Sequence, residues 1–369
     1  MKKLGFGLMR LPMNGKEVDI EKTSQLVDNF MAKGFTYFDT AWMYCESKSE
    51  MAIKQCLVDR YPRDSYTLTT KLPSYEINSF EDRDRVFNEQ LRRTGLTYFD
   101  YYWLHAVGTR NLDTFDKWKC WDFIREKKEE GLVKHIGFSF HDSAEVLDAI
   151  LSKHPEIEFV QLQLNYLDWL SQDVQSKACY DVCVKYGKPV IVMEPVKGGA
   201  LARVPDEANK LLKDAQPNMS IASWAIRFAA SLENVYMVLS GMTTLQQMQD
   251  NLSYMEDFKP LTLEENILCG KVAQIINESV FIPCTACDYC AAKCPQGIAI
   301  SKYFALYNGE KQESRETIRL VGKNSYDDIK KSSTPISECL KCGECERICP
   351  QHISIRDHLD EVKKYFEGE

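Results

Sequence analysis

Eight of the 14 cysteines form two closely spaced groups of four near the C-terminal end of the chain. Both groups have the spacing C-x₂-C-x₂-C-x₃-C-P, and they form an internal repeat at an interval of 55 residues. Four thiolates at this spacing are ligands for a [4Fe–4S] cluster. The sequence therefore predicts two such clusters. The predicted ligands are Cys284, Cys287, Cys290 and Cys294 in the first group, and Cys339, Cys342, Cys345 and Cys349 in the second.

Zinc binding and simple burial are the alternatives for these cysteines. Structural zinc usually takes two pairs of ligands from separated positions, whereas here four cysteines fall within eleven residues. Two matching groups favour iron–sulfur clusters over both alternatives. The remaining cysteines are scattered, and we expect most of them to be small core residues. They are Cys45, Cys56, Cys120, Cys179, Cys183 and Cys269.

The repeated run resembles that of bacterial two-cluster ferredoxins, in which the fourth cysteine of each run binds the other cluster. The resemblance implies one cluster at Cys284, Cys287, Cys290 and Cys349, and a second at Cys339, Cys342, Cys345 and Cys294. The runs are separated by 44 residues that include a helix-like segment, 302–320. This separation resembles the α-helical ferredoxin modules that are appended to larger redox enzymes.

Four polar residues in the first third of the chain could perform acid–base chemistry: Asp39, Tyr44, Lys71 and His105. Asp39, Lys71 and His105 end predicted strands, and Tyr44 follows in the loop after the first of them. Taken alone, each of these residues could equally have a packing role or lie on the solvated surface. In a βα barrel, however, successive strand ends meet at one mouth, where catalytic residues lie. The combination therefore predicts an active site.

The elements that must position these residues alternate between strand and helix patterns up to about residue 256. Helical patterns, such as 47–60 and 113–131, separate the short runs of β-branched and aromatic residues. Such alternation predicts an α/β protein with a (β/α)₈ TIM barrel. A doubly wound sheet is the alternative, but the turn from Gly5 to Arg10 lacks the last glycine of a dinucleotide-binding motif. The predicted strands are 4–9, 36–41, 66–72, 100–106, 133–140, 159–166, 189–195 and 235–241.

The two parts give a predicted domain organisation. We expect the barrel at residues 1–260, a helical connector at 261–277, and a small, mainly α-helical, two-cluster ferredoxin-like domain at 278–369. The formal net charge of −8 argues against nucleic acid as a partner. No apolar run approaches the roughly 20 residues needed to cross a membrane. The N-terminus lacks a signal-peptide pattern, and dense cysteine in such a chain favours metal binding, so we expect a cytoplasmic protein.

The segments GFGLMRLP, FDTAWMY, TTKL, YYWLH, IGFSF and QLQLNY occur in the order found in the aldo-keto reductase family, which residues 4–255 resemble. The resemblance implies reduction of a small aldehyde or ketone by a nicotinamide cofactor, or the reverse oxidation. Tyr44 would be the general acid, and the Lys71 ammonium would lower its pKa. Asp39 would pair with Lys71, and His105 would orient the substrate carbonyl.

The same resemblance implies nicotinamide contacts from Ser139, Gln161 and Met193, although Phe140 and Met193 depart from the family's asparagine and aromatic residues. Basic residues after strand 8 hold the 2′-phosphate in NADP-specific members, but residues 240–251 contain no lysine or arginine. This difference favours NADH. For the diphosphate and adenine side of the cofactor, the implied residues are Lys197, Gly198, Gly241, Met242, Thr243 and Asn251.

An electron-transfer module is the alternative function. In that case the ferredoxin-like domain would exchange electrons with a redox partner protein, and the barrel would be a docking scaffold or bind a flavin. Nicotinamide transfers two electrons as hydride, whereas a cluster transfers one at a time. Coupling the two would need an intermediary, although the sequence contains no separate flavin-binding unit. The four polar residues at and after the strand ends favour an enzyme over an electron-transfer module.

Overall fold

The computed structural model describes residues 2–279, 281–312 and 325–368. The chain divides into two compact units. The barrel unit consists of Met1–Val196 and Ala222–Asn266, and the cysteine unit consists of Lys197–Ile221 and Ile267–Glu369. Residues 197–221 thus pack with the cysteine-rich region, although they come between two barrel strands in the sequence. The predicted domain boundaries at residues 260 and 277 stay predictions.

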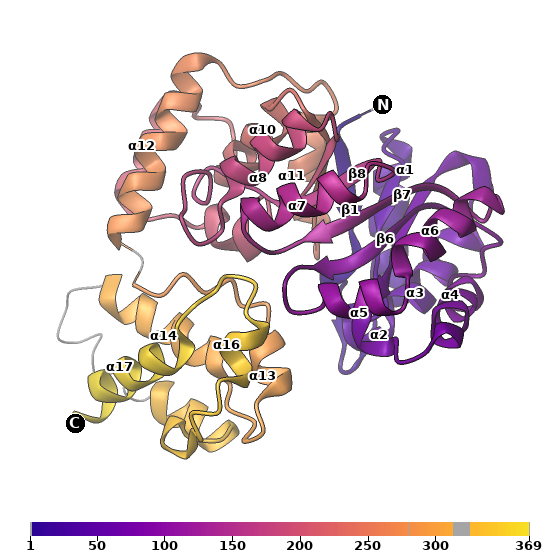
Figure 1. Cartoon of the computed structure of the whole chain (residues 1–369). Helices are drawn as coiled ribbons and strands as arrows, with labels where there is room; N and C mark the ends of the chain where they lie inside the picture. Colours follow the sequence, from indigo (N-terminus) through magenta and orange to yellow (C-terminus); the bar gives the residue numbers. More distant parts are fainter. Residues whose placement is uncertain (1, 280, 313–324, 369) are drawn as a thin grey trace. The chain divides into compact units, whose positions relative to one another are not determined.

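Eight parallel strands close into a barrel in the first unit (Figure 1). Neighbouring strands pair in chain order, and the last pairs with the first, with Leu4 opposite Val238. The predicted α/β barrel is therefore confirmed, and all eight predicted strands overlap the observed ones. These are β1 (Leu4–Gly7), β4 (Tyr37–Asp39), β5 (Thr67–Pro73), β6 (Phe99–Val107), β7 (Val133–Phe140), β8 (Phe159–Gln163), β9 (Val190–Met193) and β10 (Val235–Ser240).

Helices separate the strands, and local side-chain caps fix where several of them begin. At the start of α4, for example, Ser79 Oγ accepts a hydrogen bond from the Asp82 N–H, which otherwise lacks a helical partner. A short hairpin, β2 (Met13–Asn14) and β3 (Glu17–Val18), precedes the first helix. The helices are α1 (Ile20–Ala32), α2 (Tyr44–Ser47), α3 (Ser49–Ile53), α4 (Phe80–Thr94), α5 (Leu112–Lys117), α6 (Cys120–Glu129), α7 (Ala144–Lys153), α8 (Ser176–Lys185), α10 (Ile221–Ser231) and α11 (Leu245–Met255).

Two predicted helices are interrupted. The segment 113–131 divides into α5 and α6 at Lys119, whose φ is +47°. The segment 47–60 consists of α3 followed by a π-helical turn at Lys54–Val58. A left-handed backbone is unfavourable for a residue with a side chain, so tertiary packing must hold Lys119 in this conformation.

Large side chains fill the interior of the barrel. Tyr37, Tyr101 and Trp103 form a buried cluster with aliphatic residues of β9 and β10. A Cβ atom at Gly137 would lie 2.5 Å from the Trp103 ring and 2.4 Å from the carbonyl oxygen of Phe159. Only glycine leaves room for the indole at this point of β7. The interior of a closed eight-stranded barrel is a core of packed side chains and not a pore.

The cysteine unit is built from helices, and no strand occurs in its described residues, as the predicted mainly α-helical domain requires. Its core includes Tyr303, Tyr326, Ile355, Leu359 and Val362. The predicted segment 302–320 is helical up to Gln312, and its residues 313–320 lie outside the described residues. The helices are α9 (Asp206–Ala215), α12 (Leu263–Ser279), α13 (Tyr289–Lys293), α14 (Ile300–Gln312), α16 (Glu344–Ile348) and α17 (Ile355–Glu367). Within the described chain, no helix is both long and apolar enough to cross a membrane.

Candidate active site and cluster sites

Asp39, Lys71 and His105 lie toward the carboxyl ends of β4, β5 and β6, which are neighbours in the barrel. Tyr44 is the first residue of α2, after the end of β4. The structure therefore brings the four predicted catalytic residues to one end of the barrel. Catalytic groups of TIM-barrel enzymes lie at this end.

Lys71 is the centre of this group, and its side chain is completely buried. Its Nζ donates hydrogen bonds to Asp39 Oδ1 at 2.6 Å, to the Thr40 carbonyl oxygen at 2.8 Å and to the Tyr44 hydroxyl oxygen at 3.5 Å. Three directed bonds fix the ammonium in place. The contact with Tyr44 puts positive charge next to the phenol oxygen, which favours the phenolate form.

Burial shifts the pKa of Asp39, Lys71 and His105. It raises the pKa of Asp39 and lowers the pKa of Lys71, and the attraction between the two charges opposes both shifts. Burial also lowers the pKa of His105 well below 6.5, and the Lys71 and His141 charges add to the effect. The His105 imidazole is therefore neutral at pH 7, when it can both donate and accept a hydrogen bond.

Tyr44 and His105 are both partly exposed, and their rings meet edge to face with centroids 6.1 Å apart. The three residues after Tyr44 all have positive φ, with 52° at Cys45, and Ala106 after His105 has a φ of 56°. Non-glycine residues in this conformation are uncommon and cluster at functional sites. The arrangement fits a phenol and an imidazole that face a common substrate oxygen.

A second polar network, which the sequence reasoning missed, lies behind Lys71. Gln90 Nε2 donates to the Lys71 carbonyl oxygen at 3.0 Å and to Glu50 Oε1 at 2.7 Å. Thr70 Oγ1 also donates to Glu50 Oε1 at 2.7 Å. Burial raises the pKa of Glu50, while its hydrogen bonds and Arg93 act in the opposite direction. This network anchors the end of β5. Its only sequence signal is a glutamate in an otherwise amphipathic helix.

The residues predicted to contact nicotinamide also make bonds within the barrel. Ser139 Oγ accepts from the Ala106 N–H at 2.7 Å, and Gln161 Nε2 donates to Asp39 Oδ2 at 3.4 Å. Phe140 is buried and Met193 is partly exposed. The Ser139 hydroxyl can still donate a hydrogen bond, and the Gln161 side-chain carbonyl can still accept one. Each can therefore bind one end of a carboxamide. The donor and acceptor types therefore fit nicotinamide at these two positions.

Four other predicted cofactor residues lie at the end of β10 and in α11. Thr243 Oγ1 donates to the Arg10 carbonyl oxygen at 2.7 Å, and Gly241 and Met242 precede it. The Gln247 side chain accepts from the N–H groups of Thr243 and Thr244 and caps α11. Asn251 bonds to Ser240 and to the Gln247 carbonyl oxygen. Bonds within the protein thus engage the side chains of Thr243 and Asn251.

Arg10 is a second residue that the sequence reasoning missed. A Cβ atom on Gly241 would lie 3.8 Å from Arg10 Cβ and 3.9 Å from Cδ, so the arginine stem lies against this loop. Among the described residues, its buried Nη2 atom has no hydrogen-bond partner. A guanidinium in this position is suited to an oxygen anion. Its signal in the sequence was the arginine at the end of the turn that resembles a dinucleotide-binding motif.

Lys197 and Gly198, predicted for the cofactor diphosphate, belong to the cysteine unit. The buried Lys197 Nζ donates to Gln351 Oε1 at 2.9 Å. A Cβ atom on Gly198 would lie 2.3 Å from the Thr285 carbonyl oxygen. Gly198 therefore contacts the first cysteine motif, and Lys197 contacts the segment that follows the second. Their role in binding a diphosphate stays a prediction.

The two cysteine runs have the same backbone conformation at matching positions. Ala286 and Lys341, which are 55 residues apart, have φ of 50° and 53°. The pairs Asp288 with Gly343 and Gly297 with His352 are equally spaced and also have positive φ. The sequence repeat is therefore a structural repeat, and each run contains a five-residue helix, α13 or α16, that ends just before its last cysteine.

Cys284, Cys287, Cys290 and Cys349 lie close enough to interact electrostatically. Burial, followed by Cys287, Cys284 and Cys349, raises the pKa of Cys290 to about 12. The pKa of Cys284 is raised to about 11, again mainly by burial and with smaller effects of Cys287 and Cys349. The Ala286 N–H donates to Cys284 Sγ at 3.5 Å. Four cysteines from two runs are the donor set that a [4Fe–4S] cluster requires, so the residues fit this group.

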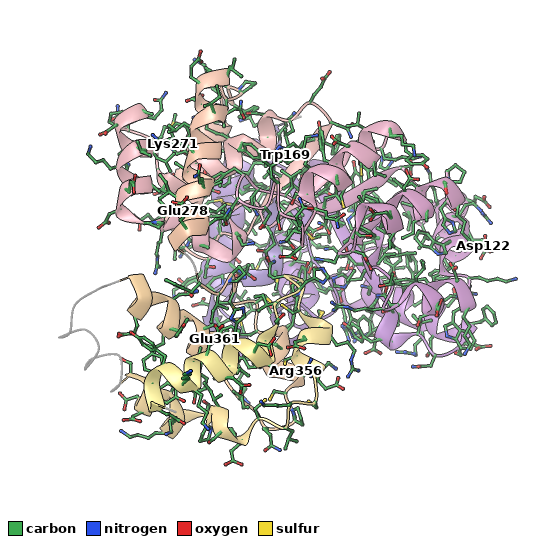
Figure 2. The ribbon with its side chains drawn as sticks, turned by 60° about the vertical axis from the view of Figure 1, so that its left-hand side comes forward. Asp122, Trp169, Lys271, Glu278, Arg356 and Glu361 are labelled. Atoms are coloured by element: carbon green, nitrogen blue, oxygen red, sulfur yellow. The ribbon has the colours of Figure 1, made fainter. Side chains whose placement is uncertain are left out.

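The other four predicted ligands line a single cavity. Cys294 comes from the first run, and Cys339, Cys342 and Cys345 come from the second. Arg356 on α17, labelled in Figure 2, lines the same cavity. Among the described residues, no three histidine, cysteine, aspartate or glutamate side chains are grouped as around one metal ion. The cavity and its donors also fit a cluster.

Comparisons with known proteins assign both parts of the chain. Residues 3–272 match the aldo/keto reductase family, and residues 283–353 match a 4Fe-4S dicluster domain. An uncharacterized oxidoreductase of Saccharomyces cerevisiae is 24% identical over 261 residues, which cover 68% of this chain and 86% of the yeast protein. An aldehyde reductase of the same yeast is 24% identical over 294 residues, or 71% of this chain and 84% of its own length.

Solved structures have the same barrel. An aldo-keto reductase from Bacillus halodurans is 24% identical, with a TM-score of 0.61 over 73% of this chain and 91% of its own. An aldo-keto reductase from Klebsiella pneumoniae, solved in complex with NADPH, is 17% identical, with a TM-score of 0.58 over 73% of this chain and 90% of its own. At these identities the likeness concerns the fold, while the match over residues 3–272 covers most of the chain. The chain belongs to the aldo/keto reductase family and has a 4Fe-4S dicluster domain after its barrel.

Proposed function

We propose that the barrel reduces an aldehyde or ketone with a nicotinamide cofactor, or catalyses the reverse oxidation, with Tyr44 as the general acid. The observation that carries this proposal is the hydrogen-bonded series from Asp39 through Lys71 to the Tyr44 hydroxyl. A phenol with an ordinary pKa near 10 is a poor acid–base catalyst at pH 7, and an adjacent ammonium lowers that pKa.

Each residue of the series has a distinct task. The cofactor supplies a hydride to the carbonyl carbon when it is bound. Tyr44 donates its hydroxyl proton to the carbonyl oxygen, and Lys71 stabilises the resulting phenolate. Asp39 keeps Lys71 charged and in position. The neutral His105 donates a hydrogen bond to the same carbonyl oxygen and orients the substrate.

We further propose that the cofactor is NADH. The absence of lysine and arginine from residues 240–251 leaves this stretch without a cation for a 2′-phosphate. In addition, Gln247 occupies the N–H groups of Thr243 and Thr244, which could otherwise bind an anion. Arg10, which lies against Gly241, would bind a diphosphate oxygen. Ser139 and Gln161 would hold the carboxamide.

Two [4Fe–4S] clusters complete the proposal, with ligands exchanged between the cysteine runs. Cys284, Cys287, Cys290 and Cys349 would hold one cluster, and Cys294, Cys339, Cys342 and Cys345 the other. Such clusters supply one-electron transfer. The density of cysteine, assigned here to clusters and not to disulfides, supports a cytoplasmic location, where disulfides are rare.

A second candidate is an electron-transfer protein, in which the cysteine unit exchanges electrons with a redox partner and the barrel serves for docking or holds a flavin. The buried Phe140, at the position of the family's asparagine, favours this candidate because it removes a carboxamide contact.

Replacing Tyr44 with phenylalanine tests the first candidate. We expect kcat for carbonyl reduction with NADH to fall by about 10²- to 10⁴-fold, the usual contribution of general acid catalysis. An unchanged kcat contradicts the assignment of Tyr44. The visible spectrum of anaerobic protein, recorded before and after addition of NADH, tests the connection between the parts. Bleaching of the iron–sulfur absorption supports coupling, and clusters that stay oxidised need another electron donor.

A further inference from the structure

The loop Lys197–Gly199 contacts the chain at or next to both cysteine runs. All three residues have positive φ, of 47°, 64° and 102°. This tight left-handed backbone brings Gly198 against the Thr285 carbonyl oxygen, where any side chain would collide. Thr285 lies between Cys284 and Cys287, so the loop packs on the ligand-bearing turn of the first run.

The Lys197 side chain extends the contact to the second run. Its Nζ donates to Gln351 Oε1 at 2.9 Å, and only 4% of Lys197 and 5% of Gln351 are exposed. Gln351 is two residues after Cys349, and Cys349 interacts with Cys284 and Cys290. The loop thus contacts both chain segments that provide the ligands of one cluster, the cluster at Cys284, Cys287, Cys290 and Cys349.

We propose that Lys197 is a resident positive charge of this cluster site. Through Gln351 it holds the segment that bears Cys349, and its ammonium raises the reduction potential of this cluster above the value that the same site would have without it. This inference rests on the cluster ligands proposed above. It gives Lys197 a different task from the binding of a cofactor diphosphate.

The direction of the effect follows from charge. One-electron reduction makes a thiolate-ligated cluster more negative, so a nearby cation stabilises the reduced state more than the oxidised state. Net charge, hydrogen bonding and exposure set the potentials of such clusters. Burial strengthens the effect because water screens a buried charge less than an exposed one. A lysine in this position therefore makes its cluster easier to reduce.

The test is a redox titration of the full-length protein, reconstituted anaerobically and followed by electron paramagnetic resonance. In Lys197→Met we expect a roughly tenfold smaller equilibrium constant for reduction of one cluster, which corresponds to about 59 mV for one electron. The other cluster should keep its potential. Lys197→Arg, which retains the charge, should stay close to the wild type.

Lys331→Met is the matched control, because it removes the same charge from a lysine of the cysteine unit whose side chain is 76% exposed and paired with Asp328. We expect both potentials to be unchanged. Iron and sulfide analysis of every variant accompanies the titration. Selective loss of one cluster in Lys197→Met, with two retained in Lys197→Arg and Lys331→Met, also supports the proposal.

Unchanged potentials in a fully loaded Lys197→Met protein, or equal shifts of both clusters, would overturn the role of Lys197 and leave the cluster ligands intact. A wild-type protein that binds no clusters would instead contradict the proposed ligands themselves, and with them the role of Lys197. Activity with carbonyl substrates enters none of these readouts. A result that contradicts the role of Lys197 can therefore be told apart from a result that contradicts carbonyl reduction by the barrel.

Discussion

Lys71 and Asp39 form an ion pair of 2.6 Å in which the lysine side chain is completely buried and the aspartate side chain is 3% exposed. Each charge is stable there only because of the other, since an isolated charge in the interior of a protein is costly. The same ammonium reaches the Tyr44 hydroxyl. Stability of the barrel and acidity of the phenol therefore depend on one side chain.

Replacing Lys71 with methionine should destabilise the barrel strongly. The variant leaves Asp39 as a buried carboxylate without its cation, and breaking a buried pair on one side typically costs about 3–5 kcal/mol. We expect a loss of this size in the free energy of unfolding, measured by urea denaturation of the purified protein.

The double variant Lys71→Met with Asp39→Leu is the control. It removes both charges, so its loss of stability should be smaller than the sum of the two single losses. Additive losses would mean that the two side chains contribute independently to folding. They would contradict the interaction energy that the 2.6 Å contact implies.

His105 should make the protein less stable in mild acid. Its folded pKa lies well below 6.5, so the unfolded state binds more protons between the two values. Stability therefore rises with pH in this window; the contribution is fully present above about pH 6.5 and is lost as the pH falls toward the folded pKa. Replacing His105 with glutamine should reduce the drop in Tm between about pH 8 and about pH 5.5.

The matched control is His358→Gln, which removes a histidine of the cysteine unit that lies beside Glu361 and makes no contact with the Lys71 group. Its drop in Tm over the same pH range should equal that of the wild type. If His105→Gln also keeps the full drop, the low folded pKa of His105 is not the cause of the acid sensitivity.

Arg10 should affect the cofactor and not the chemical step. Removing its guanidinium with Arg10→Ala takes away a charge-assisted bond, worth about 1.5–3 kcal/mol. We expect the KM for NADH to rise at least about tenfold, since about 1.4 kcal/mol corresponds to a factor of ten, with kcat little changed. Arg125→Ala is the control, because Arg125 pairs on the surface of α6 with Asp122, which is labelled in Figure 2. A KM that is equal in the two variants contradicts a role for Arg10.

Periodicity and strand-end chemistry were sufficient to predict the barrel and to bring Asp39, Tyr44, Lys71 and His105 to one end of it. This worked because closure of parallel strands fixes where their carboxyl ends meet. The left-handed residues Cys45 and Lys119 were not predictable, since tertiary contacts impose these conformations against local preference.

The contacts of Lys197 and Arg10 were also beyond the sequence. A lysine before two glycines has the same local pattern whether it binds a phosphate or packs on another part of the chain. Only the fold brings Gln351, 154 residues away, to its ammonium. The repeat at 55 residues, by contrast, was visible in the sequence, and the structure adds to it the equal backbone turns at matching positions of the two runs.

The exchange of ligands between the cysteine runs makes a specific prediction about single cysteine variants. Cys294 shares a cavity with Cys339, although Cys290 is its neighbour in the sequence. Cys294→Ser and Cys339→Ser should therefore alter the paramagnetic resonance signal of one cluster, and Cys290→Ser that of the other. If Cys294→Ser and Cys290→Ser alter the same signal, each run holds its own cluster. Cys294→Ser and Cys339→Ser would then alter different signals, and the proposed exchange of ligands between the runs would be wrong.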